Sequence, residues 1–419
     1  MPEFPYIEIM APAGNFAALT AAMQGGADAV YFGIGELNMR AHAANNFNPD
    51  DLEGIVAFCR QHGMRSYLTL NTVIYDADIE KMELILDKAR AAGVSAVIAS
   101  DMAAITAARA RELEVHISTQ LNISNLASVK FFAQFADVVV LARELRLEQI
   151  HAIAQGIREQ DIKGPSGQLV KLELFCHGAL CMAISGKCYL SLHHYNASAN
   201  RGACFQLCRR AYTVTDKETG AQLDIDQEYI MSPKDLSTIR FIDKILAAGV
   251  SVLKIEGRAR APEYVKCVTS VYKKGVAACR EGRFSPELGQ QWQQELETVF
   301  NRGFWDGYYQ GAQLGEWSEV YGNKASRRKE YLGKVSNYFD RIGVAEIALE
   351  TGDLAVGDEI MIMGPTSGVL EQTVSEVRLE LTPIPSAPKG SICSISIASP
   401  QKIRRNDKVF KIITVESIF

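Results

Sequence analysis

The sequence lacks any apolar run that approaches the about 20 residues of a membrane-spanning helix. Its first ten residues, MPEFPYIEIM, contain neither the basic stretch nor the apolar stretch of a secretory signal. We therefore expect a cytoplasmic protein with no membrane contact. Disulfides are also disfavoured, because they accumulate in oxidising compartments and because the chain has an odd number of cysteines, nine.

Several catalytic signatures are also missing. The chain has no HExxH zinc-protease motif, no GxSxG nucleophile elbow, and no Cys–His dyad outside one cysteine-rich segment. These absences argue against proteolysis. No GxGxxG follows the first predicted strand, which argues against dinucleotide binding.

Excess positive charge is absent as well. Lys plus Arg number 44 and Asp plus Glu 49, so the formal net charge is −5. A chain that coats nucleic acid without specificity would carry the opposite sign. Binding of nucleic acid would therefore require a local basic patch.

What is present is a chain of 419 residues, 47% hydrophobic and 22% charged, as in ordinary globular proteins. Most of its apolar runs are followed by helical patterns, such as 78–93 and 101–112. The predicted strands are 7–14, 29–34, 66–74, 96–100, 115–121, 137–144, 171–178 and 251–258. Strands that are apolar throughout are typical of a parallel sheet covered on both faces. The pattern favours a (β/α)8 TIM-type barrel over residues 1–300, with an open doubly wound sheet as the alternative.

In the last part of the chain, the alternation of strand and helix patterns gives way to short β runs. From about Tyr331 short β runs alternate with Gly-Asp and Pro turns, which predicts a small antiparallel β-barrel domain over 331–419. Residues 301–330 are the predicted linker. Basic residues gather in this part, and they could hold RNA phosphates or merely be solvated. They are Lys324, Arg327, Arg328, Lys329, Lys402, Arg404, Arg405, Lys408 and Lys411.

The segment 176–212 holds five of the nine cysteines. Cys176 ends an apolar run and is expected to be a buried structural thiol. The other four, Cys181, Cys188, Cys204 and Cys208, lie in a long Gly-, Ser- and Asn-rich stretch without apolar periodicity. A loop of this length is uncommon unless it is functional or tied down, and four thiolates on one metal centre would tie it down.

The spacing of these four cysteines helps to choose the centre. Structural zinc sites bring cysteines in tight CxxC-type pairs, whereas here the intervals are six, fifteen and three residues. Irregular spacing suits a cysteine-rich insertion that binds a 4Fe–4S cluster, with zinc or four free thiols as alternatives. Cys204 and Cys208 would share one face if a helix begins there.

A barrel carries its chemistry at the C-terminal ends of its strands. Polar residues gather at those ends or in the segments that follow. As catalytic candidates we take Arg143, Glu144, His177, Lys254, Glu256 and Arg258. As substrate-binding candidates we take Asn71, Gln120, Lys234, Asp235, Arg209 and Arg210. Simpler roles remain open: ion pairs among the strand-end charges, support of a cluster ligand by His177, and a helix N-terminus after Ser232-Pro233.

Ordered motifs across the chain resemble the collagenase-like U32 peptidase family. They include GGADAVYFG at 25–33, HISTQLN at 116–122, HGALCMAISGKC at 177–188, SPKDL at 232–236 and LKIEGR at 253–258. Within the family, the chain is similar to the branch that hydroxylates tRNA. Other members act on a ribosomal RNA cytidine or on ubiquinone precursors, and the family's historical label is proteolysis.

The resemblance implies a function and a ligand set. It implies an iron–sulfur protein that converts the wobble uridine of tRNA to 5-hydroxyuridine without O2, with prephenate as a required metabolite. The implied partners are the tRNA anticodon loop and an electron or oxygen donor. Many relatives carry a cysteine after KDL as the fourth cluster ligand, where this chain has Ser237. Cys208 is therefore the expected fourth ligand, and Ser237 is a poorer alternative.

Overall fold

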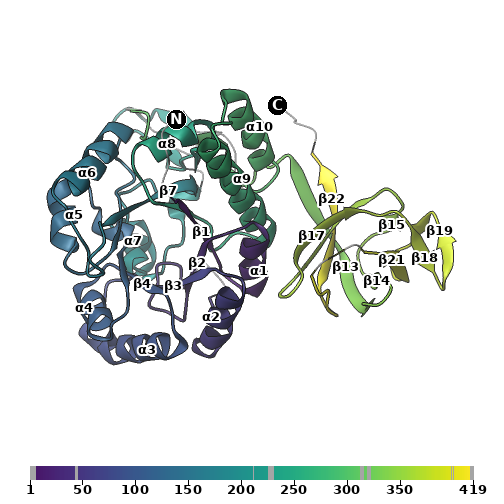
Figure 1. Cartoon of the computed structure of the whole chain (residues 1–419). Helices are drawn as coiled ribbons and strands as arrows, with labels where there is room; N and C mark the ends of the chain where they lie inside the picture. Colours follow the sequence, from purple (N-terminus) through teal and green to yellow (C-terminus); the bar gives the residue numbers. More distant parts are fainter. Residues whose placement is uncertain are drawn as a thin grey trace.

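The computed structural model describes residues 6–42, 46–210, 212–224, 231–311, 316–318, 322–397, 399 and 401–415. The first five residues of the chain and position 211 of the cysteine segment thus lie outside the described part. Figure 1 shows a ring of strands surrounded by helices, with a second, all-β unit beside α1 and α9.

The larger unit is a closed parallel barrel. Its strands are β1 (Glu8–Pro12), β2 (Ala29–Gly33), β3 (Arg65–Leu70), β4 (Ala96–Ala99), β5 (Val115–Ile117), β6 (Val138–Val140), β7 (Lys171–Gly178) and β11 (Val252–Ile255). Each strand pairs in parallel with the next, and β11 pairs with both β7 and β1, which closes the ring. The prediction of an eight-stranded parallel barrel is confirmed, and the open-sheet alternative is wrong.

Helices on the outside cover the strands. They are α1 (Phe16–Gln24), α2 (Leu52–Gln61), α3 (Ile79–Ala92), α4 (Met102–Ala110), α5 (Leu126–Phe132), α6 (Leu147–Glu159), α8 (Ile242–Ala247), α9 (Pro262–Arg280) and α10 (Pro286–Glu297). Local sequence explains several of the ends: the side chains of Asn15, Asp101 and Asn125 accept hydrogen bonds from backbone N–H groups of the first turn. Gly93 ends α3 in the left-handed conformation, at φ 77°.

Several predicted strands extend too far, among them 66–74, 115–121 and 137–144, the last of which ends at Val140 in β6. Residues 71–74 lie beyond the end of β3, and Thr119–Leu121 form a 3-10 turn after β5. After β3, a side chain takes the place of a neighbouring strand, because Asp101 Oδ2 accepts a hydrogen bond from the Ile74 N–H at 3.0 Å. The backbone groups are satisfied without a neighbouring strand, so the strands stop early.

Two expectations for helices are wrong. The SPKDL motif forms β10 (Asp235–Ser237), which pairs antiparallel with β7 and parallel with β12 (Phe304–Trp305). Cys204 and Cys208 share no helix, because Gln206 between them has φ 51° and only a 3-10 turn, Leu207–Arg209, follows. The partners of these backbones are set by tertiary contacts, which local sequence does not encode.

The smaller unit is an antiparallel sheet in the order β17-β16-β22-β13-β14-β21-β18-β19, with a two-stranded β15–β20 pair. Its strands are β13 (Arg327–Phe339), β14 (Val344–Leu349), β15 (Leu354–Ala355), β16 (Glu359–Gly364), β17 (Gly368–Thr373), β18 (Val377–Leu379), β19 (Thr382–Ile384), β20 (Ser386–Ala387), β21 (Ile392–Ser396) and β22 (Lys408–Thr414). The antiparallel domain is therefore confirmed. Closure into a barrel is not, because within the described residues no ladder joins β17 to β19.

The two units meet along α1. Gln24 donates a hydrogen bond to the Ser367 carbonyl at 2.9 Å and accepts one from the Val369 N–H at 2.9 Å. Thr20 donates to the Pro365 carbonyl at 2.7 Å. These bonds fix β17 against the barrel.

Charged side chains fill part of the barrel interior. Lys254 Nζ lies 2.7 Å from Glu173 Oε1, and both side chains are buried. The same carboxylate faces the buried His116, which also lies 3.1 Å from Glu114. Burial raises the pKa of Glu173, but Lys254 and His116 outweigh it, so the carboxyl stays ionised with a pKa below its usual range.

We expect Glu173→Gln to lower the free energy of unfolding by about 3–5 kcal/mol, because it leaves the buried Lys254 charge without a partner. The matched control is Glu281→Gln, which removes an exposed pair with Arg283 and should change stability by about 0.5 kcal/mol or less. Urea unfolding measures both. Equal losses in the two variants would contradict the importance of the interior pair.

Candidate functional site

A cavity of about 1000 Å³ opens at the C-terminal ends of the barrel strands. Its walls come from three segments that follow strands: Met39–Arg40 after β2, the cysteine segment after β7, and the stretch from Glu256 to Arg260 after β11. Met231 and Arg302, which lies before β12, complete the lining. This is the end of a (β/α)8 barrel at which active sites form.

Cys181, Cys188, Cys204 and Cys208 all line this cavity. Cys181 is exposed and the other three are partly exposed. Burial raises the pKa of the Cys208 thiol, and the other three cysteines, which lie near it, raise the pKa further. In the described part of the chain, however, no three His, Cys, Asp or Glu side chains are arranged to hold a single metal ion.

Cys176 differs from these four. It is buried in β7, and its Sγ lies 3.4 Å from the Lys254 carbonyl oxygen. Burial holds the pKa of this thiol well above its usual range. The structure thus agrees with a structural thiol at this position.

Arg209 anchors the cysteine segment. Its guanidinium donates to the carbonyls of Leu180 and Pro233, each at 2.6 Å, and to Ser232 Oγ at 2.9 Å. Asn122 donates to the Ser185 carbonyl at 3.2 Å and holds another part of the segment. Arg209 therefore positions the loop, although it also lines the cavity.

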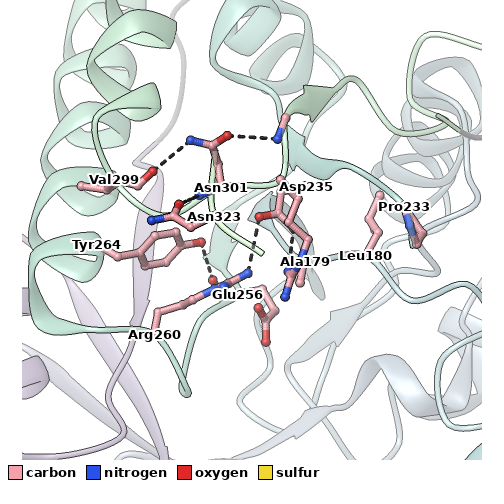
Figure 2. A network of polar contacts seen from close by, with 12 residues as sticks. Ala179, Leu180, Pro233, Asp235, Glu256, Arg260, Tyr264, Val299, Asn301 and Asn323 are labelled. Atoms are coloured by element: carbon pink, nitrogen blue, oxygen red, sulfur yellow. Dashed lines mark hydrogen bonds and ion pairs between the residues drawn. The ribbon is translucent and has the colours of Figure 1, made fainter. Parts of the chain in front are cut away.

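Glu256 and Arg40 form an ion pair on the cavity wall, 2.9 Å apart. Burial raises the pKa of Glu256, but Arg40 and Arg260 outweigh it and lower the pKa to about 2. The Tyr264 hydroxyl donates to the Glu256 carbonyl at 2.8 Å, and Figure 2 shows this tyrosine pointing toward Glu256. The wall thus holds a carboxylate that stays ionised at neutral pH.

Two arginines share the buried Asp235. Arg260 lies 3.4 Å and Arg302 3.3 Å from its carboxylate oxygens. Figure 2 shows Arg260 directed toward Asp235, between the barrel and the segment that carries Asn301. One carboxylate for two guanidinium groups leaves net positive charge beside the cavity.

The cavity lining as a whole also carries more positive than negative side chains. Its cationic side chains are Arg40, Lys187, Arg209, Arg260 and Arg302. Glu256 is the one carboxylate among the described lining residues. The cavity therefore favours anionic ligands.

His177 lies beneath the cavity. Its ring is buried against Tyr264, Tyr272 and Phe304, and its Nε2 has no hydrogen-bond partner among the described residues. Burial and the nearby Arg260 lower its pKa to about 3. The imidazole is neutral at physiological pH.

The other candidates from β3, β5, β6 and β11 lie apart from the cavity. Arg258 is buried and donates to Asn38 Oδ1 at 2.9 Å and Thr69 Oγ1 at 2.8 Å, and burial lowers its pKa to about 10. Arg143 packs on the Phe175 ring and donates to the Ala179 carbonyl at 3.1 Å.

Further candidates lie deeper or on the surface. Lys254 is inside the barrel and Glu144 is exposed. Asn71 and Gln120, 3.3 Å apart, line a separate cavity of about 120 Å³. Lys234 pairs with Glu316 at 2.9 Å.

The structure thus brings the four cysteines, Glu256 and Arg209 together at one cavity. Sequence reasoning did not identify Arg40, Arg260 and Arg302. Arg260 follows Arg258 by two residues, which is a usable signal, but Arg40 and Arg302 come from loops far away in sequence. Ser237, the alternative ligand, is buried and donates to Gln293 Oε1 at 2.8 Å.

Three of the basic residues expected to form a patch in the C-terminal domain, Arg327, Lys329 and Lys411, are held in ion pairs. Arg327 bonds Glu359 and Glu371, at 3.1 and 3.0 Å. Lys329 bonds Glu263 at 2.6 Å and Lys411 bonds Asp358 at 2.7 Å. These pairs weaken the basic patch that the sequence suggests for RNA phosphates.

We expect His177 to keep the chemical shift of a neutral ring from pH 8 to about pH 4.5 in spectra of ring-labelled protein, because its pKa is about 3. The unfolded chain takes up this proton near pH 6.5, so His177 lowers the free energy of unfolding as the pH falls from about 6.5 toward 3. His177→Gln assigns the signal. A titration midpoint near 6.5 would show that the ring is not buried as described.

Comparisons with known proteins place the chain in a family. The model of "Peptidase family U32" matches residues 14–319. A protein of Porphyromonas gingivalis named collagenase is 55% identical over 404 residues, 96% of this chain and 97% of that one. The tRNA hydroxylation protein P1 of Bacillus subtilis is 32% identical over 378 residues, 88% of this chain and 86% of that one.

A solved U32 peptidase, Mk0906, has a TM-score of 0.40 at 12% identity and covers 61% of this chain and 97% of its own. Within the described residues, no helix is both long and apolar enough to cross a membrane. The narrower resemblance to tRNA-hydroxylating proteins rests on lower identity than the resemblance to the protein named collagenase. The chain belongs to peptidase family U32.

Proposed function

We propose that this chain is a redox enzyme that hydroxylates an RNA base, with Cys181, Cys188, Cys204 and Cys208 as the ligands of a 4Fe–4S cluster. The observation that carries the proposal is that all four cysteines line one cavity at the C-terminal end of the barrel. A cytoplasmic location accords with it, since free thiols and iron–sulfur ligands persist in a reducing compartment.

The donor set fits such a cluster. Iron–sulfur clusters take four cysteine thiolates, and the iron atoms of a cubane spread those thiolates over more space than a single ion does. All four cysteines line one cavity, as ligands of a shared cluster must. When bound, the cluster would supply one-electron chemistry that side chains lack.

The chain's own residues would bind and orient the substrate. Arg40, Arg260 and Arg302 give the cavity the positive charge that phosphates or carboxylates require. Prephenate, implied as a required metabolite by the family resemblance, carries carboxylates that suit these arginines. Glu256 stays ionised and could accept a hydrogen bond from an N–H group of the base, since Arg40 contacts only its Oε1.

The finer part of the proposal is the substrate. The wobble uridine of tRNA is unpaired in the anticodon loop, so it can enter a cavity at little cost, and its conversion to 5-hydroxyuridine would proceed without O2. The B. subtilis relative named for tRNA hydroxylation supports this choice. Inserting oxygen into the base C–H bond without O2 is a two-electron oxidation, so an oxygen-atom donor would be a further partner, and an electron donor alone would not balance the reaction.

Peptide hydrolysis is the second candidate, because the P. gingivalis relative at 55% identity is named collagenase. The geometry supports it less well. None of the cavity's four cysteines is hydrogen-bonded to a histidine among the described residues, and His177 is buried with its Nε2 unpartnered. A cysteine nucleophile needs such a base for activation.

Nucleoside analysis of tRNA from a strain that lacks the gene tests the proposal. We expect 5-hydroxyuridine and the nucleosides derived from it to disappear. The wild-type gene and Cys59→Ala should restore them, because Cys59 is buried in α2, whereas Cys188→Ala should not, because it removes a cluster ligand.

Two outcomes would contradict the proposal. Unchanged nucleosides in the deletion strain would reject tRNA as the substrate. Gelatin cleavage by the purified chain that persists in Cys188→Ala would favour the peptidase alternative and separate it from the cluster.

A further inference from the structure

We propose that Tyr189, Tyr195, Phe205 and Arg210, which we call the aromatic platform, stack the unpaired bases of an RNA loop next to the cavity. This inference rests on the proposed function and identifies where the RNA would be held. No step of the chemistry depends on it, so the two ideas can fail separately.

The platform is an exposed apolar surface. Tyr189 is 72% exposed, and Tyr195 and Phe205 are each 50% exposed. Clustered aromatic side chains on a surface that folding does not bury mark interaction sites. The rings of Tyr195 and Phe205 lie edge to face, with centroids 5.3 Å apart.

Local contacts hold these rings in place. The Phe205 N–H donates to Ser191 Oγ at 3.0 Å, which ties it to α7 (Leu190–Tyr195). Arg210 donates to the Tyr195 hydroxyl at 3.0 Å, and its guanidinium carbon lies 5.8 Å from the ring centroid. Tyr195 and Phe205 are therefore partly ordered before a ligand binds, which lowers the entropy lost on stacking.

The platform and the cysteines share one segment. Tyr189 follows Cys188 and Phe205 follows Cys204 in sequence. Tyr189 and Cys188 both line the cavity. A base stacked on the platform would therefore place its neighbour at the cavity entrance.

Charge favours RNA as the occupant. Between Glu173 and Asp216 the sequence has no acidic residue, although the whole chain has a net charge of −5. Within this stretch, Lys187 and Arg210 are exposed, and so are His193 and His194 of α7. Proteins that bind single-stranded RNA combine aromatic rings with cationic side chains that follow the backbone phosphates.

A proline-rich peptide is the other class of ligand that docks on aromatic rings. Such a peptide carries no regular negative charge, so it would gain nothing from a segment of 42 residues, 174–215, without Asp or Glu. The arginine beside Tyr195 also matches a phosphate or a base face better than a proline ring. We therefore assign the surface to RNA.

Binding of RNA to the full chain, purified with its metal centre intact, tests the assignment. The probes are an RNA hairpin with an unpaired loop, a blunt RNA duplex of equal length, and a gelatin peptide. We expect Phe205→Leu and Tyr195→Leu each to weaken hairpin binding about tenfold and to leave duplex binding unchanged. Phe205→Tyr and Tyr195→Phe keep a ring and should bind the hairpin within about threefold of wild type.

The matched control is Phe131→Leu on α5, a ring that is 54% exposed and packs against Phe132. It should leave hairpin binding unchanged. Thermal unfolding and the visible spectrum of each variant show whether the fold and the metal centre persist. Retained binding by the ring-keeping variants shows that the ring, rather than local folding, is needed.

Three results would overturn the platform: equal hairpin binding by Phe205→Leu and Phe131→Leu, equal losses for hairpin and duplex, or platform-dependent binding of the gelatin peptide instead of RNA. If the gene restores 5-hydroxyuridine while the platform variants bind normally, the platform is wrong and the proposed function stands. Hairpin binding that depends on the rings, without any change in tRNA nucleosides in the deletion strain, supports the platform and rejects tRNA as the substrate.

Discussion

The parallel pairing of β7 with β11 is the constraint on which the candidate site depends. Glu173 pairs with Val252 and His177 with Ile255, with a register shift after Lys254. This pairing closes the barrel and brings together two segments that are about 80 residues apart. The cysteine segment leaves β7 and the Glu256–Arg260 stretch leaves β11 at the same end, so one pairing places both halves of the cavity wall.

Buried ion pairs restrict how the side chains in and above the barrel can be arranged, because a buried charge without its partner is destabilising. Glu173 and Lys254 pair inside the barrel, and Asp235 pairs with Arg260 and Arg302 beside the mouth. Taking such ions out of water costs several kcal/mol each unless their partners are in place. The arginines of the cavity are thus held before a ligand arrives, which suits a site for an anionic ligand.

Much of the barrel could be predicted from the sequence because its strands are continuous apolar runs. β1, β2, β4, β7 and β11 fall within their predicted ranges. The strand ends could not be predicted, because the backbone after β3 and β5 bonds to loop and turn groups instead of a neighbouring strand: the Ile74 N–H bonds Asp101 Oδ2, and the Leu121 N–H bonds the Ser118 carbonyl. β10 could not be predicted as a strand, because its partners, β7 and β12, are distant in sequence.

The site was predictable in residue type but not in pairing. The four cysteines could be identified by their number and spacing, and in the structure all four line one cavity. The partner of each side chain could not be predicted: Arg258 binds Asn38 and Thr69, and the ion-pair partner of Glu256 is Arg40. Such choices depend on which loops meet above the barrel, and no local pattern records them.

The central claim is that the four cysteines of the cavity hold one iron–sulfur cluster. Chemical analysis of iron and acid-labile sulfide in protein purified without oxygen, together with its electron paramagnetic resonance spectrum after reduction, tests it most directly. The account predicts about four iron and four sulfide per chain, with a paramagnetic signal on reduction. Stoichiometric zinc, or a chain that binds no iron even after anaerobic reconstitution, would contradict it.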